Sequence, residues 1–193
     1  MTARRIYFME EKKTSTKTLV TYGLLTAIVV ILQLLGSFVR FGPFSISLVL
    51  MPIVIGGALC GPAAGAWLGF VFSVTVLCMD SSAFLAVSIP GTLCTVILKG
   101  VLAGYLSGLV YKALEKTGSV LATFAAAFVC PVINTGIFLL GCKVFFMPQI
   151  TEWGQALGFE NAAKYLIFGM VGGNFIFELA INMILSPVIV RLV

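Results

Sequence analysis

Residues 41–79 read FGPFSISLVLMPIVIGGALCGPAAGAWLGFVFSVTVLCM and contain no charged residue. As one helix, this stretch would be about 58 Å long at 1.5 Å per residue, which is about twice the hydrocarbon thickness of a bilayer. Gly61-Pro62 is the natural break, because glycine is typical of a helix end and proline cannot continue a helix. The stretch therefore predicts two membrane-spanning helices, at about 45–60 and 63–79.

Uncharged segments of similar character make up most of the chain, which has 193 residues, 60% of them hydrophobic and 10% charged. Residues 18–39, 81–98 and 117–142 carry no charge, and 165–190 carry only Glu178. Continuous runs of this length argue against barrel strands, which are about ten residues of alternating polarity. We expect an all-α polytopic membrane protein with six transmembrane helices, at about 18–38, 45–60, 63–79, 92–113, 119–146 and 165–191.

Basic residues decide the expected orientation. The formal net charge is +5, and five of the basic residues lie in the first 17 positions. Positive charge favours the cytoplasmic side, so we expect both termini to be cytoplasmic, residues 1–17 to form a basic tail, and 18–193 to form one transmembrane substrate-binding domain. The first apolar run is too long for a signal peptide and lacks an A-x-A site, which predicts a retained helix. The outer connections would be 39–44, 80–91 and 147–164.

Catalytic signatures are missing from the sequence. There is no histidine, no G-x-x-x-x-G-K-[ST] loop and no G-x-S-x-G elbow, so we predict no enzyme, no ATP hydrolysis by this chain, no metal site and no cofactor. The five cysteines are dispersed without a C-x-x-C pair, and we interpret them as small packing residues.

Six charged residues nevertheless lie in or beside membrane-grade sequence. An ionisable group in hydrocarbon costs several kcal/mol, so it usually faces a cavity, a partner or a substrate. This pattern favours a carrier or binding protein over a passive anchor. The six are Arg40, Asp80, Lys99, Lys143, Glu160 and Glu178.

A polar stripe marks the sixth predicted helix, where Asn174, Glu178 and Asn182 are spaced four residues apart and share one face. One interpretation is a wall that faces a ligand, with Glu178 accepting a hydrogen bond from it. The alternative is a buried network between helices, with Glu178 protonated or paired to Lys99. The Asn182 end lies towards the cytoplasm and is expected to be structural.

Further candidates for substrate binding precede this stripe. Asn134 follows Pro131, which frees a backbone carbonyl and opens a place for a cavity. Lys143 is either a partner for an anionic ligand group or a side chain that extends to the outer interface. Trp153 and Phe41, in outer connections, are either aromatic contacts to a ligand or members of an interfacial belt. Pro148 is expected to end the fifth helix.

Glycines spaced four apart predict close helix contacts. We expect packing between helices at two ladders and, at Gly23 and Ala27 in the first helix, either internal packing or docking of a separate membrane subunit. The ladders are Gly61, Gly65, Gly69 and Gly100, Gly104, Gly108.

The whole arrangement resembles a known family. Six helices, a basic tail, the string Phe44-Ser45-Ile46-Ser47-Leu48 before Pro52, and the Gly61-Pro62-Ala63-Ala64-Gly65 turn are similar to the substrate-binding (S) components of energy-coupling factor (ECF) type ABC transporters. The closer likeness is to the branch of riboflavin, folate and pantothenate binders.

The resemblance implies a mechanism and partners. Such a component binds a vitamin in an outward-facing pocket and docks on a transmembrane coupling subunit with two cytoplasmic ATPases. Gly23 and Ala27 match the positions of a small-residue motif that contacts the coupling subunit. The pocket candidates are then Asn134, Lys99, Lys143, Asn174 and Glu178, with Trp153 as a lid, and a lysine with amides would suit a carboxylate-bearing vitamin such as pantothenate.

Two other functions remain open from the sequence. A self-sufficient carrier or channel would use Glu178 and Lys99 as an ion or proton relay. A structural or assembly protein would use its glycine ladders to bind a partner. An importer subunit predicts ligand binding without transport by the lone chain, a carrier predicts ion-coupled uptake in liposomes, and an assembly protein predicts neither.

Overall fold

The computed structural model describes residues 16–38, 40–41, 44–45 and 48–192, and nearly all of them are helical. The all-α prediction is confirmed. The longer helices are α1 (Thr16–Phe38), α2 (Leu50–Cys60), α3 (Pro62–Met79), α5 (Ile89–Leu114), α6 (Ser119–Gly141) and α9 (Gly172–Leu192). The shorter elements are α4 (Ser82–Val87), α7 (Met147–Ala156), α8 (Ala162–Lys164), a 3-10 turn at Glu115–Thr117 and π-helical segments at Cys142–Phe146 and Tyr165–Val171.

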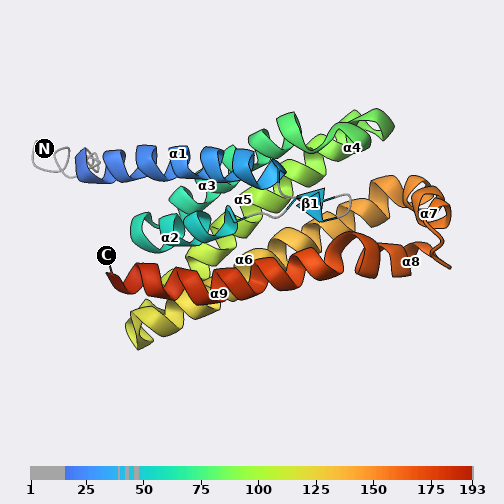
Figure 1. The fold of residues 1–193 in the computed structure, drawn as a ribbon. Coiled ribbons are helices and arrows are strands. Elements are labelled where there is room, and N and C mark those ends of the chain that lie inside the picture. The colour runs from blue at the N-terminus through green and yellow to red at the C-terminus, as the bar shows by residue number, and fades with distance from the viewer. Residues whose placement is uncertain (1–15, 39, 42–43, 46–47, 193) are drawn as a thin grey trace, which may run out of the picture.

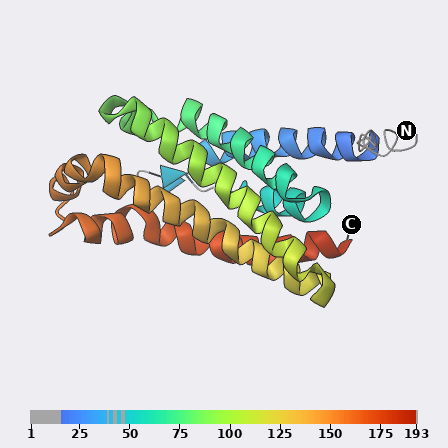
Figure 2. The ribbon, with the colours of Figure 1, turned by 180° about the vertical axis from the view of Figure 1, so that it is seen from behind.

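Among the described residues, five helical stretches are long and apolar enough to cross a membrane, and the shorter apolar helix α2 accompanies them. The five are Thr18–Ser37, Pro62–Met79, Ile89–Thr117, Ser119–Ala156 and Ala162–Val190. The chain is therefore an integral, multi-pass membrane protein. The start of α1 and the end of α9 lie at the same end of the bundle, whereas α4 and α7 lie at the opposite end (Figures 1 and 2).

The second span differs from its prediction. We expected a helix from about residue 45, but Phe44–Ser45 forms strand β2, which pairs antiparallel with β1 (Arg40–Phe41) in a small hairpin. Helix α2 therefore begins at Leu50 and has 11 residues, or about 17 Å of rise, so it is the shorter apolar helix beside five long spans, and the predicted arrangement of six spans agrees with this. The pairing of Arg40 with Ser45 and of Phe41 with Phe44 keeps these residues extended, so a helix cannot begin at residue 45.

The break between α2 and α3 falls where the sequence places it. Gly61 has φ of +92°, a conformation that L side chains rarely adopt. Pro62 then opens α3, at a position where its missing N–H costs no helical hydrogen bond. Gly61 thus terminates a helix, and a Cβ built on it would have no described atom within 4 Å beyond those of its chain neighbours.

The other ladder glycines lie where α3 crosses α5. A Cβ built on Gly65 or Gly69 would overlap the carbonyl oxygen of Gly104 or Gly100, respectively. Ser73 strengthens this crossing, because its hydroxyl donates to Val96 O of α5 at 2.7 Å. Such close backbone approach is the use to which membrane proteins put small residues. Helix α5 contacts α6 on its other side, and α9 packs on α6.

The fifth span continues further than predicted. Pro148 does not end the helix, because it lies in the first turn of α7, where proline is tolerated. The π-helical segment Cys142–Phe146 links α6 directly to α7. The expected connection 147–164 is therefore largely helical, and its end carries an exposed ion pair between Lys164 and Glu160.

Candidate functional site

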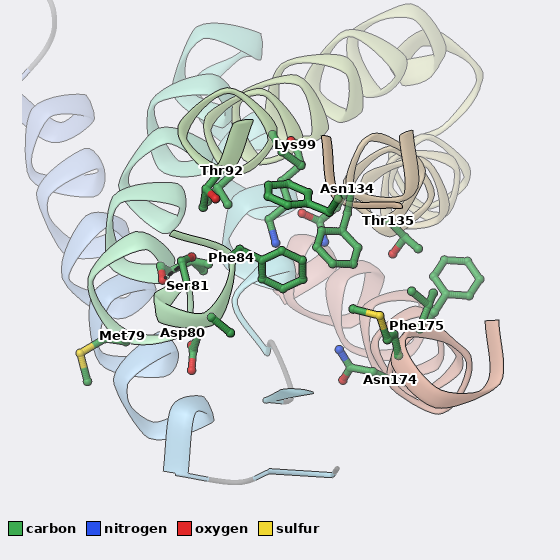
Figure 3. Close-up of a pocket in the computed structure, with 18 of the residues that line it drawn as sticks. Met79, Asp80, Ser81, Phe84, Thr92, Lys99, Asn134, Thr135, Asn174 and Phe175 are labelled. Atoms are coloured by element: carbon green, nitrogen blue, oxygen red, sulfur yellow. Dashed lines mark hydrogen bonds between the residues drawn. The ribbon is translucent and has the colours of Figure 1, made fainter. Parts of the chain in front are cut away.

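A cavity of about 200 Å³ lies at the end of the bundle that carries α4 and α7. Its walls come from α1, α3, α4, α5, α6 and α9 and from both π-helical segments. Figure 3 shows side chains from these elements gathered around it. Of the sequence candidates, the structure brings four to this cavity: Lys99, Asn134, Asn174 and Glu178.

Lys99 projects from α5 between two aromatic rings. Its ammonium nitrogen is 5.5 Å from the ring centre of Phe72 and 5.4 Å from that of Phe138. Both distances are within the range of a cation–π interaction, which is worth up to about 2 kcal/mol when the pair is desolvated. The two ring faces thus stabilise the half-buried ammonium group of Lys99 inside the bundle.

The polar stripe of α9 divides into two parts. Asn174 donates from Nδ2 to Glu178 Oε1 at 3.0 Å, and both residues line the cavity. Asn182 instead donates to Ala127 O of α6 at 3.1 Å and accepts from Ser186 Oγ at 3.0 Å. Asn174 and Glu178 thus face the cavity, whereas Asn182 connects α9 to α6 by a hydrogen bond.

A second carboxylate lies on the other side of the cavity. Asp80 caps the end of α3, and its Oδ2 accepts from Gln33 Nε2 at 2.9 Å and from Ser37 Oγ at 2.8 Å. Gln33 also lines the cavity, although the sequence analysis did not single it out. A signal existed, since Gln33 is the one amide side chain in the uncharged run 18–38.

Four polar atoms around the cavity have no hydrogen-bond partner among the described residues, although they are buried. Buried polar groups in folded proteins are nearly always paired, so each exception needs an explanation. All four of their residues line this cavity. The atoms are Gln33 Oε1, Thr95 Oγ1, Asn134 Oδ1 and Asn174 Oδ1.

An aromatic group covers the cavity. Phe84 of α4 lines it and makes edge-to-face contacts with three other rings. Its ring centre is 5.8 Å from Phe138, 5.1 Å from Phe146 and 5.5 Å from Trp153. Phe138 and Phe146 line the cavity as well. Trp153 does not line it but contacts the lining residue Phe84.

The remaining candidates lie elsewhere or outside the described part. Lys143 is exposed on the π-helical segment Cys142–Phe146 and does not line the cavity. The side chains of Phe41 and Arg40 fall outside the described residues. Gly23 and Ala27 are exposed on α1, and no described atom lies within 4 Å of a Cβ built on Gly23.

Comparison with protein families decides what this architecture is. A family model described as "ECF transporter, substrate-specific component" matches residues 17–190, nearly the whole chain. The chain belongs to this family. Searches of curated proteins and of solved structures give no match.

Membership in the ECF substrate-specific components fixes the general role of the chain. It is a membrane-embedded, non-catalytic subunit that binds a transport substrate. Within such a subunit, a cavity in the bundle with buried polar atoms that lack partners is the natural candidate for the substrate site.

Proposed function

We propose that this ECF component binds a vitamin or a related micronutrient in the cavity around Lys99, Asn134, Asn174 and Glu178. The observation that supports this proposal most strongly is that four buried polar atoms without a partner among the described residues belong to residues that line this cavity. An unpaired buried polar group costs about 1–3 kcal/mol, and a ligand that pairs with these atoms recovers that cost. A substrate-specific component must bind its transport substrate, so we expect a small molecule to occupy this cavity.

Transport would then need partners. We propose that the chain docks on a transmembrane coupling subunit carrying two cytoplasmic ATPases, through the face of α1 that holds Gly23 and Ala27. Both residues are exposed and small, and small residues allow two membrane helices to approach closely. Helix α4, which lines the cavity, lies at the end of the bundle opposite to the start of α1 (Figure 1), so substrate binding and docking use different parts of the molecule.

The location follows from the same role. We propose that the chain lies in the cytoplasmic membrane of a prokaryote with both termini inside. The cavity then faces outward, since it is at the end opposite to the start of α1 and the end of α9. The basic residues of the N-terminal tail support this orientation.

Ligand binding is tested by native mass spectrometry of the purified chain, followed by thermal shifts with water-soluble vitamins. A ligand present at 100 times its dissociation constant adds about 2.7 kcal/mol of stability. Asn134→Leu should remove about half of this gain or more, as expected for binding that is about tenfold weaker or worse, whereas Gln155→Leu on the exposed face of α7 should leave it unchanged. Full stabilisation of the Asn134→Leu variant by the same vitamin would place the ligand outside the cavity.

Docking is tested by purifying this chain and measuring how much coupling subunit and ATPase from the same organism co-purify with it. Ala27→Phe should remove the partners while leaving vitamin binding intact. Leu35→Phe is the control, because Leu35 is also exposed on α1 and lies about 80° around the helix from Ala27 at 100° per residue. Equal loss of partners in both variants, or in neither, would contradict docking through the Gly23 and Ala27 face.

A further inference from the structure

We propose that the cavity accepts a neutral or cationic ligand that donates hydrogen bonds on two sides, and that Asp80 and Glu178 are positioning residues that orient the amides of Gln33 and Asn174. The inference rests on the proposed function of the cavity and names the chemical class of its substrate. Two carboxylate–amide pairs and two further buried acceptors in the lining carry it.

The first pair joins α3 to α1. A carboxylate only accepts hydrogen bonds, so the amide group next to it must present its nitrogen. Gln33 does so, with Nε2 donating to Asp80 Oδ2 at 2.9 Å. Its oxygen Oε1 is thereby turned away from the carboxylate. That oxygen is buried without a partner among the described residues, in a residue that is 1% exposed.

The second pair lies across the cavity on α9. Asn174 presents Nδ2 to Glu178 Oε1 at 3.0 Å, and Glu178 is itself 5% exposed. The oxygen Oδ1 of Asn174 is again left buried and unpartnered within the described part of the chain. Two different elements therefore offer the cavity the same group, an amide oxygen whose orientation a carboxylate has fixed.

Two further side chains add acceptor capacity between these pairs. Asn134 of α6 is 7% exposed and has an unpartnered Oδ1, and Thr95 of α5 has an unpartnered Oγ1 among the described atoms. Three amide oxygens and a hydroxyl thus surround the cavity. A ligand can pair with all three amide oxygens only by donating, through N–H or O–H groups.

The acceptors of the lining also argue against a ligand carboxylate. The described lining contains two carboxylates, Asp80 and Glu178, and one ammonium, Lys99. Lys99 already interacts with the rings of Phe72 and Phe138. A ligand carboxylate has no N–H or O–H to donate, so it could not pair with the amide oxygens of Gln33, Asn134 and Asn174. The cavity therefore favours a ligand that donates hydrogen bonds, whereas the lysine and amides in the sequence suggest a carboxylate-bearing ligand that accepts them.

Size and walls narrow the class further. The cavity of about 200 Å³ is smaller than pockets for drug-sized ligands, which are about 300–1,000 Å³. Phe84, Phe138, Phe146 and Phe175 contribute aromatic walls. The ligand is therefore a compact compound with a flat apolar body, with amino, amide or hydroxyl groups at opposite edges and no carboxylate or phosphate.

The direct test identifies what the chain retains. The full chain in detergent is incubated with the small-molecule fraction of an extract of its own cells, passed through a desalting column and denatured, and the released compound is identified by accurate mass and fragmentation. We expect a neutral or cationic compound with donors at two edges. A retained anionic compound that Asn134→Leu releases would overturn the inference and leave the proposed function standing. Retention of no compound would overturn the proposed function, and this inference with it.

The polarity of binding is tested by two substitutions at Asn134. Asp keeps an acceptor and removes the donor, whereas Leu removes both, at similar size. If the ligand donates to Asn134, Asn134→Asp should keep its affinity and Asn134→Leu should lose about tenfold or more. Equal losses in both variants would mean that the ligand accepts from the amide nitrogen, which contradicts the proposal. Gln33→Met, with Gln155→Met as its exposed control, provides the same test on α1.

The positioning role is tested by Asp80→Asn and Glu178→Gln. Each substitution keeps the shape of the side chain but replaces a carboxylate, which only accepts hydrogen bonds, with an amide, which both donates and accepts. The neighbouring Gln33 or Asn174 amide can then exchange the positions of its oxygen and nitrogen. The readout is the ratio of affinities for nicotinamide and nicotinate, and for tryptamine and indole-3-acetate, measured by displacement of the retained compound. The wild-type chain should prefer the donor-bearing member of each pair, and both variants should lose most of this preference. An unchanged preference in both variants would assign the two carboxylates a purely structural role.

Discussion

Helices α3 and α5 meet in two different ways along their length, and the difference separates a rigid region from a binding region. Around Gly65, Gly69, Gly100 and Gly104 their backbones touch, and no room exists for even a methyl group. Further along, Asp80 at the end of α3 and Lys99 of α5 line a cavity, near polar atoms that have no partner among the described residues. The close contact holds the two helices together. Beyond it, the two helices carry side chains larger than glycine, and the cavity that these side chains line can hold a substrate.

The largest effect is expected in the close contact. Gly104→Ala would push a methyl group into the carbonyl oxygen of Gly65, and overpacking of this kind typically costs about 1–3 kcal/mol. The control is Gly136→Ala on α6, where a Cβ would meet no described atom within 4 Å outside its own helix backbone and the better helix propensity of alanine should stabilise by up to about 1 kcal/mol. Thermal unfolding in detergent measures both. Equal melting temperatures would show that the crossing of α3 and α5 is adaptable.

The next largest effect separates the two parts of the α9 stripe. Asn182→Leu removes the hydrogen bonds to Ala127 O and from Ser186, which should cost about 1–2 kcal/mol of stability with little change in ligand affinity. Asn174→Leu should do the reverse. Thermal unfolding and ligand titration on both variants decide the matter, and loss of ligand binding in Asn182→Leu alone would refute the division.

A smaller effect of opposite sign is expected inside the cavity. Thr95→Val replaces a buried hydroxyl that has no partner among the described residues with a methyl group of similar shape, and should stabilise the unliganded chain by about 1 kcal/mol while weakening ligand binding. Thr92→Val is the matched control, because its hydroxyl donates to Ser88 O at 2.7 Å and its loss should not stabilise. Destabilisation by Thr95→Val would indicate that the hydroxyl already has a partner.

The smallest effect is expected behind the cavity wall. Trp153 contacts Phe84 but does not line the cavity, so Trp153→Leu should cost about 1 kcal/mol of stability through one lost aromatic pair and change ligand affinity less than Phe84→Leu. Titration of the two variants with the same ligand makes the comparison. A larger loss of affinity in Trp153→Leu would restore the role of a lid that directly covers the ligand.

Much of this architecture could be predicted from residue patterns. Uncharged runs with a Gly61-Pro62 break give the helices, because lipid accepts only apolar surface and fully paired backbone. The same reasoning brought attention to Asn134, Lys99, Asn174 and Glu178, which the structure places at one cavity, because polar side chains avoid lipid. Their role in binding stays a prediction.

Other features depend on contacts that no local pattern reveals. Gln33 and Asp80 are 47 positions apart, and only the fold brings them to 2.9 Å. Lys143 has the same local signature as Lys99, yet the π-helical segment leaves it exposed. Thr95 resembles any other hydroxyl residue in a helix until its lack of a partner is seen. Pro148 reads as a helix end, although the chain enters α7 there without a loop.

The central claim is that the cavity bounded by Lys99, Asn134 and Glu178 is the substrate site of this ECF component. An experimental structure of the full chain with its retained small molecule tests this most directly. We predict ligand density inside the cavity, within hydrogen-bond distance of Asn134 and of at least one of Gln33 and Asn174. Density at another place, with the cavity filled only by ordered water that pairs the four polar atoms, would contradict the account.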